Sequence, residues 1–508
     1  MNSLDLYMLG WSNIFSFWPL LLLFVGVIVG VIFGALPGLG ATAGVAIVVP
    51  LTYGMDLNAS LSLLLGIFCG AIFGGSISAT LINIPGVPAA MMTVLEAYPL
   101  ARAGKAGLVL AVSTISSFLG GIFSAIMLAF FAPLLASWAL RFGPQEYFMV
   151  ALLGISVIVL ISGDSMPRAL FAGFLGLLLA TVGEEALRGF PRYAFGVTDL
   201  RVGLHFIPVS LGLYGMAQVF NYLIDEARSG QEPEIIRSLG KITLPFRRVL
   251  SLLWVVPRNA VIGTIVGALP GTGATIGAIL SYGVEKRISR TPEAFGKGHL
   301  EAIVATETSN NATIGGAMIP LLALGIPGDA TTAIILGAFI LHGVAPGPTL
   351  FLQQPDLVSS IFVIILLANV IFLIVGLAGA RIFPKLLSIP KNILMTIVAL
   401  LCMVGAFSVH NNAFDIGTMV VFGVVGYLMR KAHIPIAPLL LTLILGPLLE
   451  SNIQRAAIID PTFIGFLTSP ISLSILIAII AMFAVPPIIQ RYKSANALPV
   501  GEDKETTS

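Results

Sequence analysis

Charged side chains are scarce in this 508-residue sequence. Asp, Glu, Lys and Arg together make up 10% of it, whereas 57% of the residues are hydrophobic. Soluble globular proteins are about a quarter charged. A chain this poor in charge cannot cover a water-facing surface, so lipid must solvate most of its outside. The sequence therefore predicts an all-α polytopic membrane protein.

Cysteine is also rare, and common catalytic signatures are missing. The two cysteines, Cys69 and Cys402, lie in apolar runs and are interpreted as small buried hydrophobic residues rather than a disulfide or metal pair. Neither a Gly-x-x-x-x-Gly-Lys-Ser/Thr loop nor a His-Glu-x-x-His pair occurs. No basic run suggests nucleic-acid binding. We expect no ATP hydrolysis, no enzyme activity and no cofactor.

The charges that remain predict an organisation into two halves. We expect a first transmembrane repeat over residues 1–224, a basic linker over 225–257, a second repeat over 258–490 and a polar tail over 491–508. Positive charge favours the cytoplasm. The linker and the C-terminus should therefore be cytoplasmic. The N-terminus should be periplasmic, because no Lys or Arg occurs before Arg102. We expect about 12 spans plus re-entrant or broken pieces, and the apolar run 107–140 is too long for one simple span.

A nine-residue segment occurs once in each half. Gly-Ala-Leu-Pro-Gly-x-Gly-Ala-Thr occupies residues 34–42 and again 267–275. Downstream, a glycine pair precedes Ile-Pro-Gly in both halves, at 84–86 and 326–328. Two ordered matches indicate internal duplication. If the first half holds an odd number of spans, the two repeats are inverted, as in many secondary transporters.

Pro-Gly-x-Gly within an apolar run should break a helix, because proline lacks an N–H and glycine permits unwound backbone. A new helix starting at Ala41-Thr42 or Ala274-Thr275 would aim N–H groups and a positive dipole end at one point. Two facing breaks would cradle a carboxylate. The alternative is a kinked, closely packed helix pair, because Gly26, Gly30 and Gly34 have small-xxx-small spacing. The proline, threonine and duplication favour a binding site.

Polar residues at membrane depth cluster in the second half, between Thr306 and Thr313. Asn310 and Asn311 offer donors and acceptors for a carboxylate or a cation, although they could simply join helices. Asn83 and Thr331 lie beside the two Ile-Pro-Gly segments. Asp329 could bind a coupling ion, Na⁺ or H⁺, but a helix N-cap is its simpler role. Glu307 is a further candidate for ion coupling.

These residues together resemble the large membrane subunit, TctA, of the tripartite tricarboxylate transporters. The resemblance covers essentially the whole chain. It rests on residues 34–42 with 50–54, 70–88, 98–104, 267–275, 310–311, 315–316, 326–328, 342–343 and 346–348. One departure is Asp329, where a small uncharged residue is usual in the family. A carboxylate there would disfavour a highly charged substrate unless it binds a cation or faces away.

The resemblance implies an elevator-type secondary transporter built from two inverted repeats with broken helices and re-entrant hairpins. It also implies a small TctB-like membrane subunit, a periplasmic TctC-like solute-binding protein, and ion-driven uptake of di- or tricarboxylates such as citrate through the bacterial inner membrane. A stand-alone permease and a non-transporting membrane scaffold are the alternatives. The residues predicted to face the substrate are Pro37, Gly38, Gly40, Ala41, Thr42, Asn83, Pro85, Gly86, Pro270, Gly271, Gly273, Thr275, Asn310, Asn311, Pro327, Gly328 and Thr331; those for ion coupling are Asn310, Asp329 and Glu307.

Overall fold

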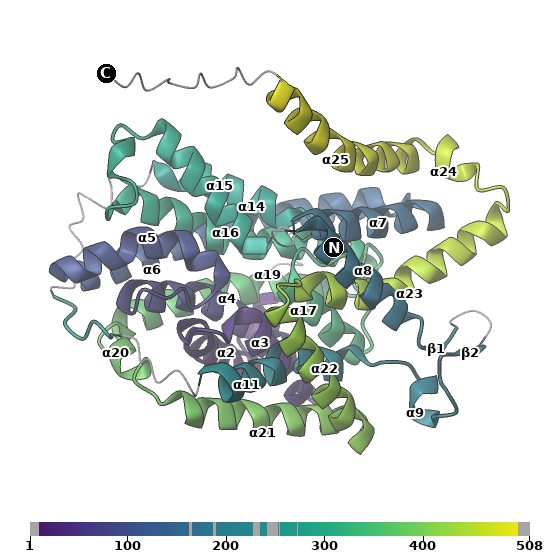
Figure 1. The fold of residues 1–508 in the computed structure, drawn as a ribbon, viewed down its shortest axis with the longest axis horizontal. Helices are drawn as coiled ribbons and strands as arrows, with labels where there is room; N and C mark the ends of the chain where they lie inside the picture. The colour runs from purple at the N-terminus through teal and green to yellow at the C-terminus, as the bar shows by residue number, and fades with distance from the viewer. Residues whose placement is uncertain are drawn as a thin grey trace, which may run out of the picture.

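The computed structural model describes residues 10–161, 165–185, 189–226, 234–240, 252, 254–271 and 273–495. Over these residues the chain is almost wholly helical (Figure 1). The one sheet in this part of the chain pairs two-residue strands antiparallel, β1 (Gly183–Glu184) with β2 (Pro191–Arg192). The all-α prediction is confirmed. Much of the predicted linker, including Arg228, Lys241, Arg247 and Arg248, and the tail after 495 lie outside the described residues.

The first half contains a series of long helices joined by short 3-10 and π-helical stretches. Its elements are α2 (Phe17–Ala35), α3 (Gly40–Val48), η1 (Val49–Thr52), α4 (Leu57–Leu81), η2 (Pro88–Ala90), α5 (Met91–Leu100), η3 (Ala101–Lys105), α6 (Ala106–Ala139), α7 (Pro144–Ile161), α8 (Met166–Ala180), α9 (Thr198–Arg201), α10 (Phe206–Ser210), η4 (Leu211–Met216), α11 (Ala217–Asn221) and η5 (Tyr222–Glu226). The long apolar run 107–140 forms a single helix, α6, with Pro133 inside it.

The second half begins in the same way, with a helix, a break and a second helix. Its elements are α14 (Val255–Ala268), α15 (Gly273–Ile288), η6 (Pro292–Ala294), α16 (Leu300–Leu324), α17 (Ala330–Leu341), α18 (Leu350–Gln353), α19 (Pro355–Gly379), α20 (Phe383–Leu386), α21 (Lys391–His410), α22 (Ala413–Lys431), α23 (Ile436–Ile459), α24 (Gly465–Thr468) and α25 (Pro470–Ala495).

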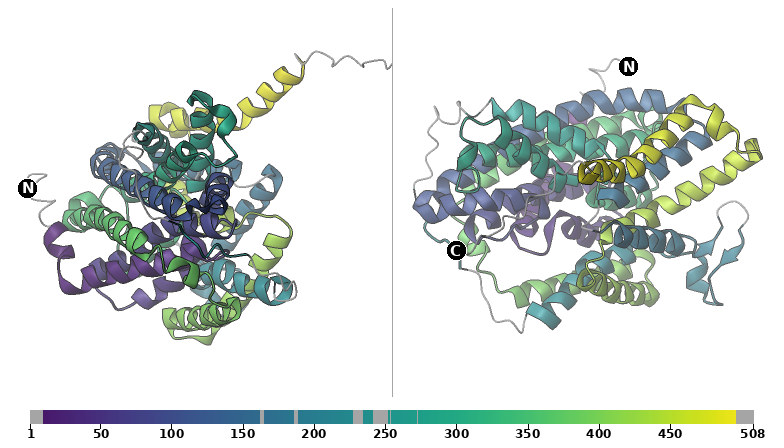
Figure 2. Two further views of the ribbon diagram at one scale, coloured as in Figure 1. Left: turned by 90° about the vertical axis from the view of Figure 1, so that its left-hand side faces the viewer. Right: turned by 45° about the horizontal axis from the view of Figure 1, so that its top comes forward.

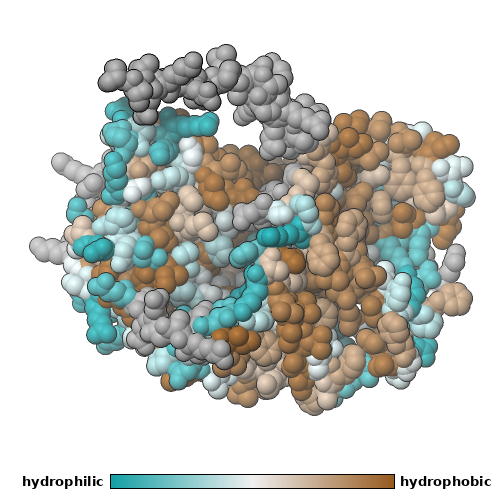
Figure 3. All heavy atoms as spheres, viewed as in Figure 1, coloured by the Kyte–Doolittle hydropathy of each residue, from teal (hydrophilic) through white to brown (hydrophobic). Residues whose placement is uncertain are grey.

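Eight helices in the described ranges are long and apolar enough to cross a bilayer, and five further apolar helices are shorter. Hydrophobic side chains cover much of the face over α22 and α23, and hydrophilic ones gather toward the two ends of the molecule (Figure 3). These features are those of a multi-pass membrane protein. Long helices alone do not reach the predicted figure of about 12 spans.

Two buried helices, α4 and α16, form the centre of the molecule. Each packs along a glycine-containing helix of its own half, α2 against α4 and α14 against α16. The two halves pack against each other: α6 of the first half packs on α16 of the second, and α19 of the second half packs on α4 of the first. Helices α7, α8 and α23 pack together beside this centre, and α25 lies on the outside against α7 (Figures 1 and 2).

The close packing within the two helix pairs repeats residue for residue. A Cβ added at Gly34 would collide with the backbone of Ala71, and one added at Gly267 would collide with the backbone of Thr313. On the partner helices, a Cβ added at Gly74 would collide with the carbonyl oxygen of Val31, and one added at Gly316 would collide with that of Thr264. The glycines of both repeats therefore do allow helix backbones to touch, as the packing interpretation expects. This packing brings each break against the centre of the molecule.

The cysteines behave as predicted, since Cys69 and Cys402 are both buried and free.

Candidate substrate and ion site

The two predicted helix breaks are present and have the same backbone conformation. Helix α2 ends at Ala35 and α3 begins at Gly40, while α14 ends at Ala268 and α15 begins at Gly273. The glycines of the first break, Gly38 and Gly40, have φ of 96° and 67°; those of the second, Gly271 and Gly273, have φ of 84° and 61°. L side chains rarely adopt such angles, which is why glycine stands at these four positions.

Each break lies against the Ile-Pro-Gly loop of its own half. A Cβ added at Gly86 would collide with the carbonyl oxygen of Gly34, and one at Gly328 would lie 2.8 Å from that of Gly267. In the second half the contact includes a hydrogen bond, because the N–H of Gly271 donates to the carbonyl oxygen of Gly328 at 2.7 Å. The motif and the loop downstream of it are therefore one structural unit, occurring twice.

The two units also meet crosswise. Helix α3, which follows the first break, contacts α17, which follows the second Ile-Pro-Gly loop; α15, after the second break, contacts η2, after the first loop. The hydroxyl oxygens of Thr42 and Thr331 lie 2.9 Å apart and share a hydrogen bond. Two predicted site residues from opposite halves, each in the first turn of its helix, thus come into direct contact.

Asp329 makes the two units unequal. The Cβ of Asp329 lies near Gly273, where the first unit places the apolar Val87 near Gly40. The Asp329 carboxylate accepts the N–H of Thr332 at 2.7 Å, and the Thr332 hydroxyl bonds back in a capping box. The simpler of its two predicted roles, the helix N-cap, is confirmed. Its negative charge is committed to the start of α17.

Asn83 is exposed in the structure and has a φ of 59°. It occupies the place that Gly325, with a φ of 72°, takes after α16. Asparagine tolerates this left-handed conformation better than most residues, so ending α4 accounts for Asn83 without a ligand. The neighbouring Pro85 is half-buried and Gly86 is buried.

Two residues near the first break were not predicted as site residues. The side-chain amide of Gln218 on α11 lies against Gly38, where an added Cβ would collide with it. The guanidinium of Arg430 on α22 donates to the Gln218 side-chain oxygen. Gln218 could have been predicted, because it is a lone glutamine within an apolar run. The sequence gives no such signal for Arg430, which indicates only the cytoplasmic side of the membrane.

A separate polar cluster lies within α16, toward its N-terminal end. The fully buried Glu307 carboxylate accepts hydrogen bonds from Thr93 Oγ1 on α5 at 2.5 Å and from Ser117 Oγ on α6 at 2.9 Å. No cationic side chain in the described ranges forms an ion pair with it. A carboxylate charge buried without a counter-ion is costly. Glu307 is therefore suited to holding a proton or a small cation.

Asn310 and Asn311 follow one turn later, and both are fully buried. The Asn311 amide nitrogen donates to the carbonyl oxygen of Glu307 at 3.1 Å. The Asn310 amide has no partner on its nitrogen or its oxygen. Buried polar groups are nearly always satisfied, so an unpaired amide points to a ligand, ion or water. No hydrogen bond between the described residues links Asn310 to either break.

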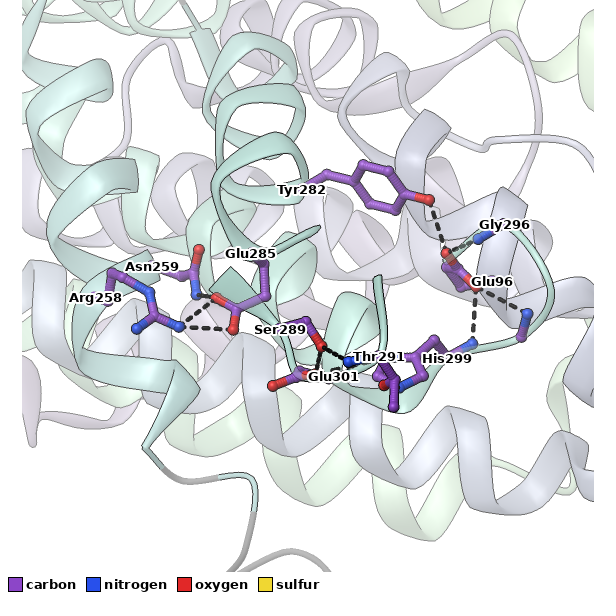
Figure 4. Close-up of polar contacts among 11 residues, drawn as sticks. Glu96, Arg258, Asn259, Tyr282, Glu285, Ser289, Thr291, Gly296, His299 and Glu301 are labelled. Atoms are coloured by element: carbon purple, nitrogen blue, oxygen red, sulfur yellow. Dashed lines mark hydrogen bonds and ion pairs between the residues drawn. The ribbon is translucent and has the colours of Figure 1, made fainter. Parts of the chain in front are cut away.

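A third polar group holds the loop before α16 against the first half (Figure 4). The buried Glu96 carboxylate on α5 accepts the N–H groups of Gly296, Gly298 and His299 at 2.5–2.8 Å and the Tyr282 hydroxyl at 2.8 Å. Negative charge before a helix stabilises its N-terminus. Glu96 thus caps a helix of the other half, which is a role that sequence spacing does not reveal.

The predicted residues therefore separate into two places. Gly38, Gly40, Thr42, Gly86, Gly271, Gly273, Gly328, Asp329 and Thr331 belong to the paired breaks, with Pro37, Ala41, Pro85, Pro270, Thr275 and Pro327 in the same segments. Glu307, Asn310 and Asn311 belong to the α16 cluster. The two places are connected by the packing of α14 on α16, because Gly267, just before the second break, lies against Thr313 of α16.

The chain is similar to known proteins over most of its length. The family model described as "Tripartite tricarboxylate transporter TctA family" matches residues 20–441. The "Uncharacterized 52.8 kDa protein in TAR-I ttuC' 3'region" of Agrobacterium vitis is 38% identical over 454 residues, covering 89% of this chain and 90% of that protein. The "Uncharacterized protein in TAR-II ttuC' 3'region" of the same organism is 39% identical over 217 residues, covering 42% of this chain and 89% of that protein. No solved structure matches the chain.

Proposed function

The chain belongs to the tripartite tricarboxylate transporter TctA family, and on that premise we propose that it is the large permease subunit of a system for ion-driven uptake of small di- or tricarboxylates such as citrate. The observation that carries the proposal is the meeting of two helix starts from opposite halves at Thr42 and Thr331. Convergent helix N-termini are a recurring device for binding anionic groups in secondary transporters.

The first break supplies the features that a carboxylate needs. Helix α3 begins at Gly40, and the preceding residue, Leu39, has no side chain that can cap it. The first N–H groups of a helix have no partner within it, so those of α3 remain available to carboxylate oxygens. Arg430, held through Gln218 beside Gly38, adds a positive charge. With Asp329 committed to capping, this break is the better anion site of the two.

Ion coupling is proposed for the α16 cluster. Glu307 has hydroxyl partners and no salt bridge in the described chain, and Asn310 has an unpaired amide one turn away. A proton or Na⁺ bound here would alter the packing of α16, which also supports the second break through Gly267 and Thr313. In the elevator-type mechanism proposed here, the two repeats are inverted and this packing links ion binding to substrate binding.

The proposed system includes a small TctB-like membrane subunit and a periplasmic TctC-like solute-binding protein that delivers the substrate. The proposed location is the bacterial inner membrane, with the N-terminus in the periplasm and the C-terminus in the cytoplasm. Basic side chains support this orientation, because Arg430 and Lys431 end α22 and Lys391 begins α21.

The proposal is tested by reconstituting the chain with its two partner subunits into vesicles. Labelled citrate and a panel of di- and monocarboxylates are supplied under a proton gradient, a sodium gradient or neither. We expect accumulation of di- or tricarboxylates under one of the two gradients alone, without ATP. Accumulation without a gradient, or equal uptake of uncharged analogues, would contradict the proposal.

Ion coupling is tested separately with Glu307→Gln, which keeps the size of the side chain and removes its ionisable group. We expect the variant to bind substrate but to lose gradient-driven accumulation. The matched control is Glu293→Gln, an exposed carboxylate at η6. If Glu307→Gln accumulates substrate as the native chain does, the coupling role assigned to Glu307 is wrong.

The Asn310 amide is tested with Asn310→Leu, which keeps the branching pattern of the side chain but removes both polar atoms. We expect uptake to fall at least ten-fold, because loss of a required hydrogen bond in a buried site costs on the order of 1.5–3 kcal/mol. Cys402→Ala, a buried apolar change on α21, is the control. Equal effects of the two changes would indicate that Asn310 only packs helices.

A further inference from the structure

A cavity of about 800 Å³ opens beside the loop that precedes α16, outside the proposed transport site. It lies where η3 and α6 of the first half meet α15 and α16 of the second. Its polar lining includes Lys105, Arg290, His299 and Glu301; its apolar lining includes Leu100 and Trp254. A cavity with both kinds of wall is suited to a ligand that is itself amphipathic.

The charge in this cavity is positive. Lys105 and Arg290 are exposed, and neither forms an ion pair with any residue that the structure describes. The one acid in the lining, Glu301, is engaged by Ser289 Oγ at 2.6 Å and lies 3.8 Å from His299 Nδ1 (Figure 4). Glu96 does not line the cavity, and its carboxylate faces three backbone N–H groups. Lys105 and Arg290 outnumber the one acid in the lining, so the cavity favours a negatively charged ligand.

The cavity continues into an apolar seam between α6 and α14. Leu252 lines both the cavity and a narrow crevice formed with Ile115, Leu119 and Val256. A small hydrophobic cluster that includes Val112, Val255 and Val304 forms the floor. Because α6 and α14 pack mainly on α16 rather than on each other, the seam between them is left shallow.

The same two helices leave a second cavity between them near the end of α6. It has a volume of about 380 Å³, is almost entirely apolar, and is lined by Leu134 and Trp138 of α6, Ile265 of α14 and Leu269 just after α14. At 1.5 Å per residue, α6 extends about 45 Å between Leu108 and Trp138. This is about the full thickness of a bilayer with its headgroups, so one phospholipid would occupy only the half of the seam next to the polar cavity.

We propose that this seam is a binding site for an anionic glycerophospholipid. The phosphate lies between Lys105 and Arg290, and the acyl chains lie along the groove between α6 and α14. A small soluble anion would account for the cations but not for the apolar seam, and an uncharged lipid would leave the cations without a partner. Basic pockets between membrane helices bind anionic headgroups in this way. The site bridges the two halves and is independent of the carboxylate transport proposed above.

The test uses the full chain in phosphatidylcholine vesicles that contain a small fraction of phosphatidylglycerol with brominated acyl chains, which quench tryptophan fluorescence on contact. Trp254 lines the cavity that holds the headgroup, whereas Trp138 lies near the far end of α6, beyond the reach of a lipid bound there. Trp254 is therefore the reporter, and a Trp254→Phe variant identifies its share of the quenching. We expect brominated phosphatidylglycerol to quench the Trp254 fluorescence at a lower mole fraction than brominated phosphatidylcholine does. Each cation contributes about five-fold in affinity, so Lys105→Gln with Arg290→Gln should lower the preference about 25-fold.

The control is Lys297→Gln, an exposed base on the same loop that does not line the cavity, and it should keep the native preference. The single Gln variants should fall between the native chain and the double variant, which guards against a folding defect in the latter. Absence of a preference in the native chain, or an unchanged preference in the double variant, would overturn the proposal. Displacement of the lipid by inorganic phosphate alone would also overturn it, because it would indicate a site for a free anion.

Discussion

Thr42 Oγ1 and Thr331 Oγ1 lie 2.9 Å apart, although 289 residues separate them in the chain. One stands in the first turn of the helix after the first break, and the other in the first turn of the helix after the second Ile-Pro-Gly loop. This contact joins the two duplicated units beside the start of α3, where we propose that the carboxylate binds.

The Thr42–Thr331 contact predicts non-additive mutants. Thr42→Val and Thr331→Val should each reduce uptake, and the double variant should be little worse than the more severe single variant. Residues in direct contact couple by about 0.5–3 kcal/mol in such cycles. Thr442→Val on α23 is the control, because Thr442 bonds only to its own helix backbone. Strictly additive losses in uptake would mean that the two hydroxyls act independently.

The break glycines should not tolerate side chains. Gly38→Val and Gly271→Val place a β-branched residue at φ of 96° and 84°, and at Gly38 the new side chain also collides with Gln218. We expect uptake to be abolished while the protein still reaches the membrane, measured by transport and by immunoblot. Gly283→Val should be active, since nothing lies within 4 Å of a Cβ there and its backbone angle is ordinary. Normal uptake by both break variants would exclude the breaks from the site.

Glu96 should matter for stability rather than for transport chemistry. Glu96→Gln replaces a carboxylate that accepts four hydrogen bonds with an amide whose NH₂ opposes backbone donors. The free energy of unfolding in detergent should fall by about 1.5–3 kcal/mol, the usual contribution of a hydrogen bond to a charged group. Tyr282→Phe removes only one of the four hydrogen bonds to the carboxylate and should lower the free energy of unfolding by less. A smaller loss for Glu96→Gln than for Tyr282→Phe would contradict the capping role.

His205 predicts a dependence of stability on pH. It precedes α10 and lines a cavity of about 170 Å³ with His410, Asp415 and Asp199. Burial, followed by the nearby His410, lowers the pKa of His205 from 6.5 to about 4. Between these values the unfolded chain takes up a proton that the native chain does not, so the free energy of unfolding should fall as pH drops from about 6.5 toward 4.

The measurement is thermal unfolding of the full chain in detergent across that pH range. His205→Gln should flatten the slope, whereas His433→Gln, an exposed histidine after α22, should leave it as in the native chain. An identical slope in the native and His205→Gln proteins would show that the environment of His205 does not control the pH response.

The sequence by itself determined the membrane class, the two helix breaks and the N-cap at Asp329. These features follow from composition and from the backbone limits of glycine and proline, which act within a few residues of where they occur. The break glycines have the left-handed angles that this reasoning requires. Local chemistry also accounts for Cys69 and Cys402, which are buried as their apolar neighbours suggest.

Only the tertiary structure decided which polar groups meet. Glu96 caps a helix of the opposite half. Gln218 lies beside the first break and accepts a hydrogen bond from Arg430. Glu307 accepts hydrogen bonds from hydroxyls on two helices of the first half. The partners in these contacts are about 190 to 214 positions apart. Such pairs form because α6 packs on α16 and α19 packs on α4, so that helices of one half contact helices of the other. No local propensity or spacing encodes this packing, because it results from burying whole helix faces against one another.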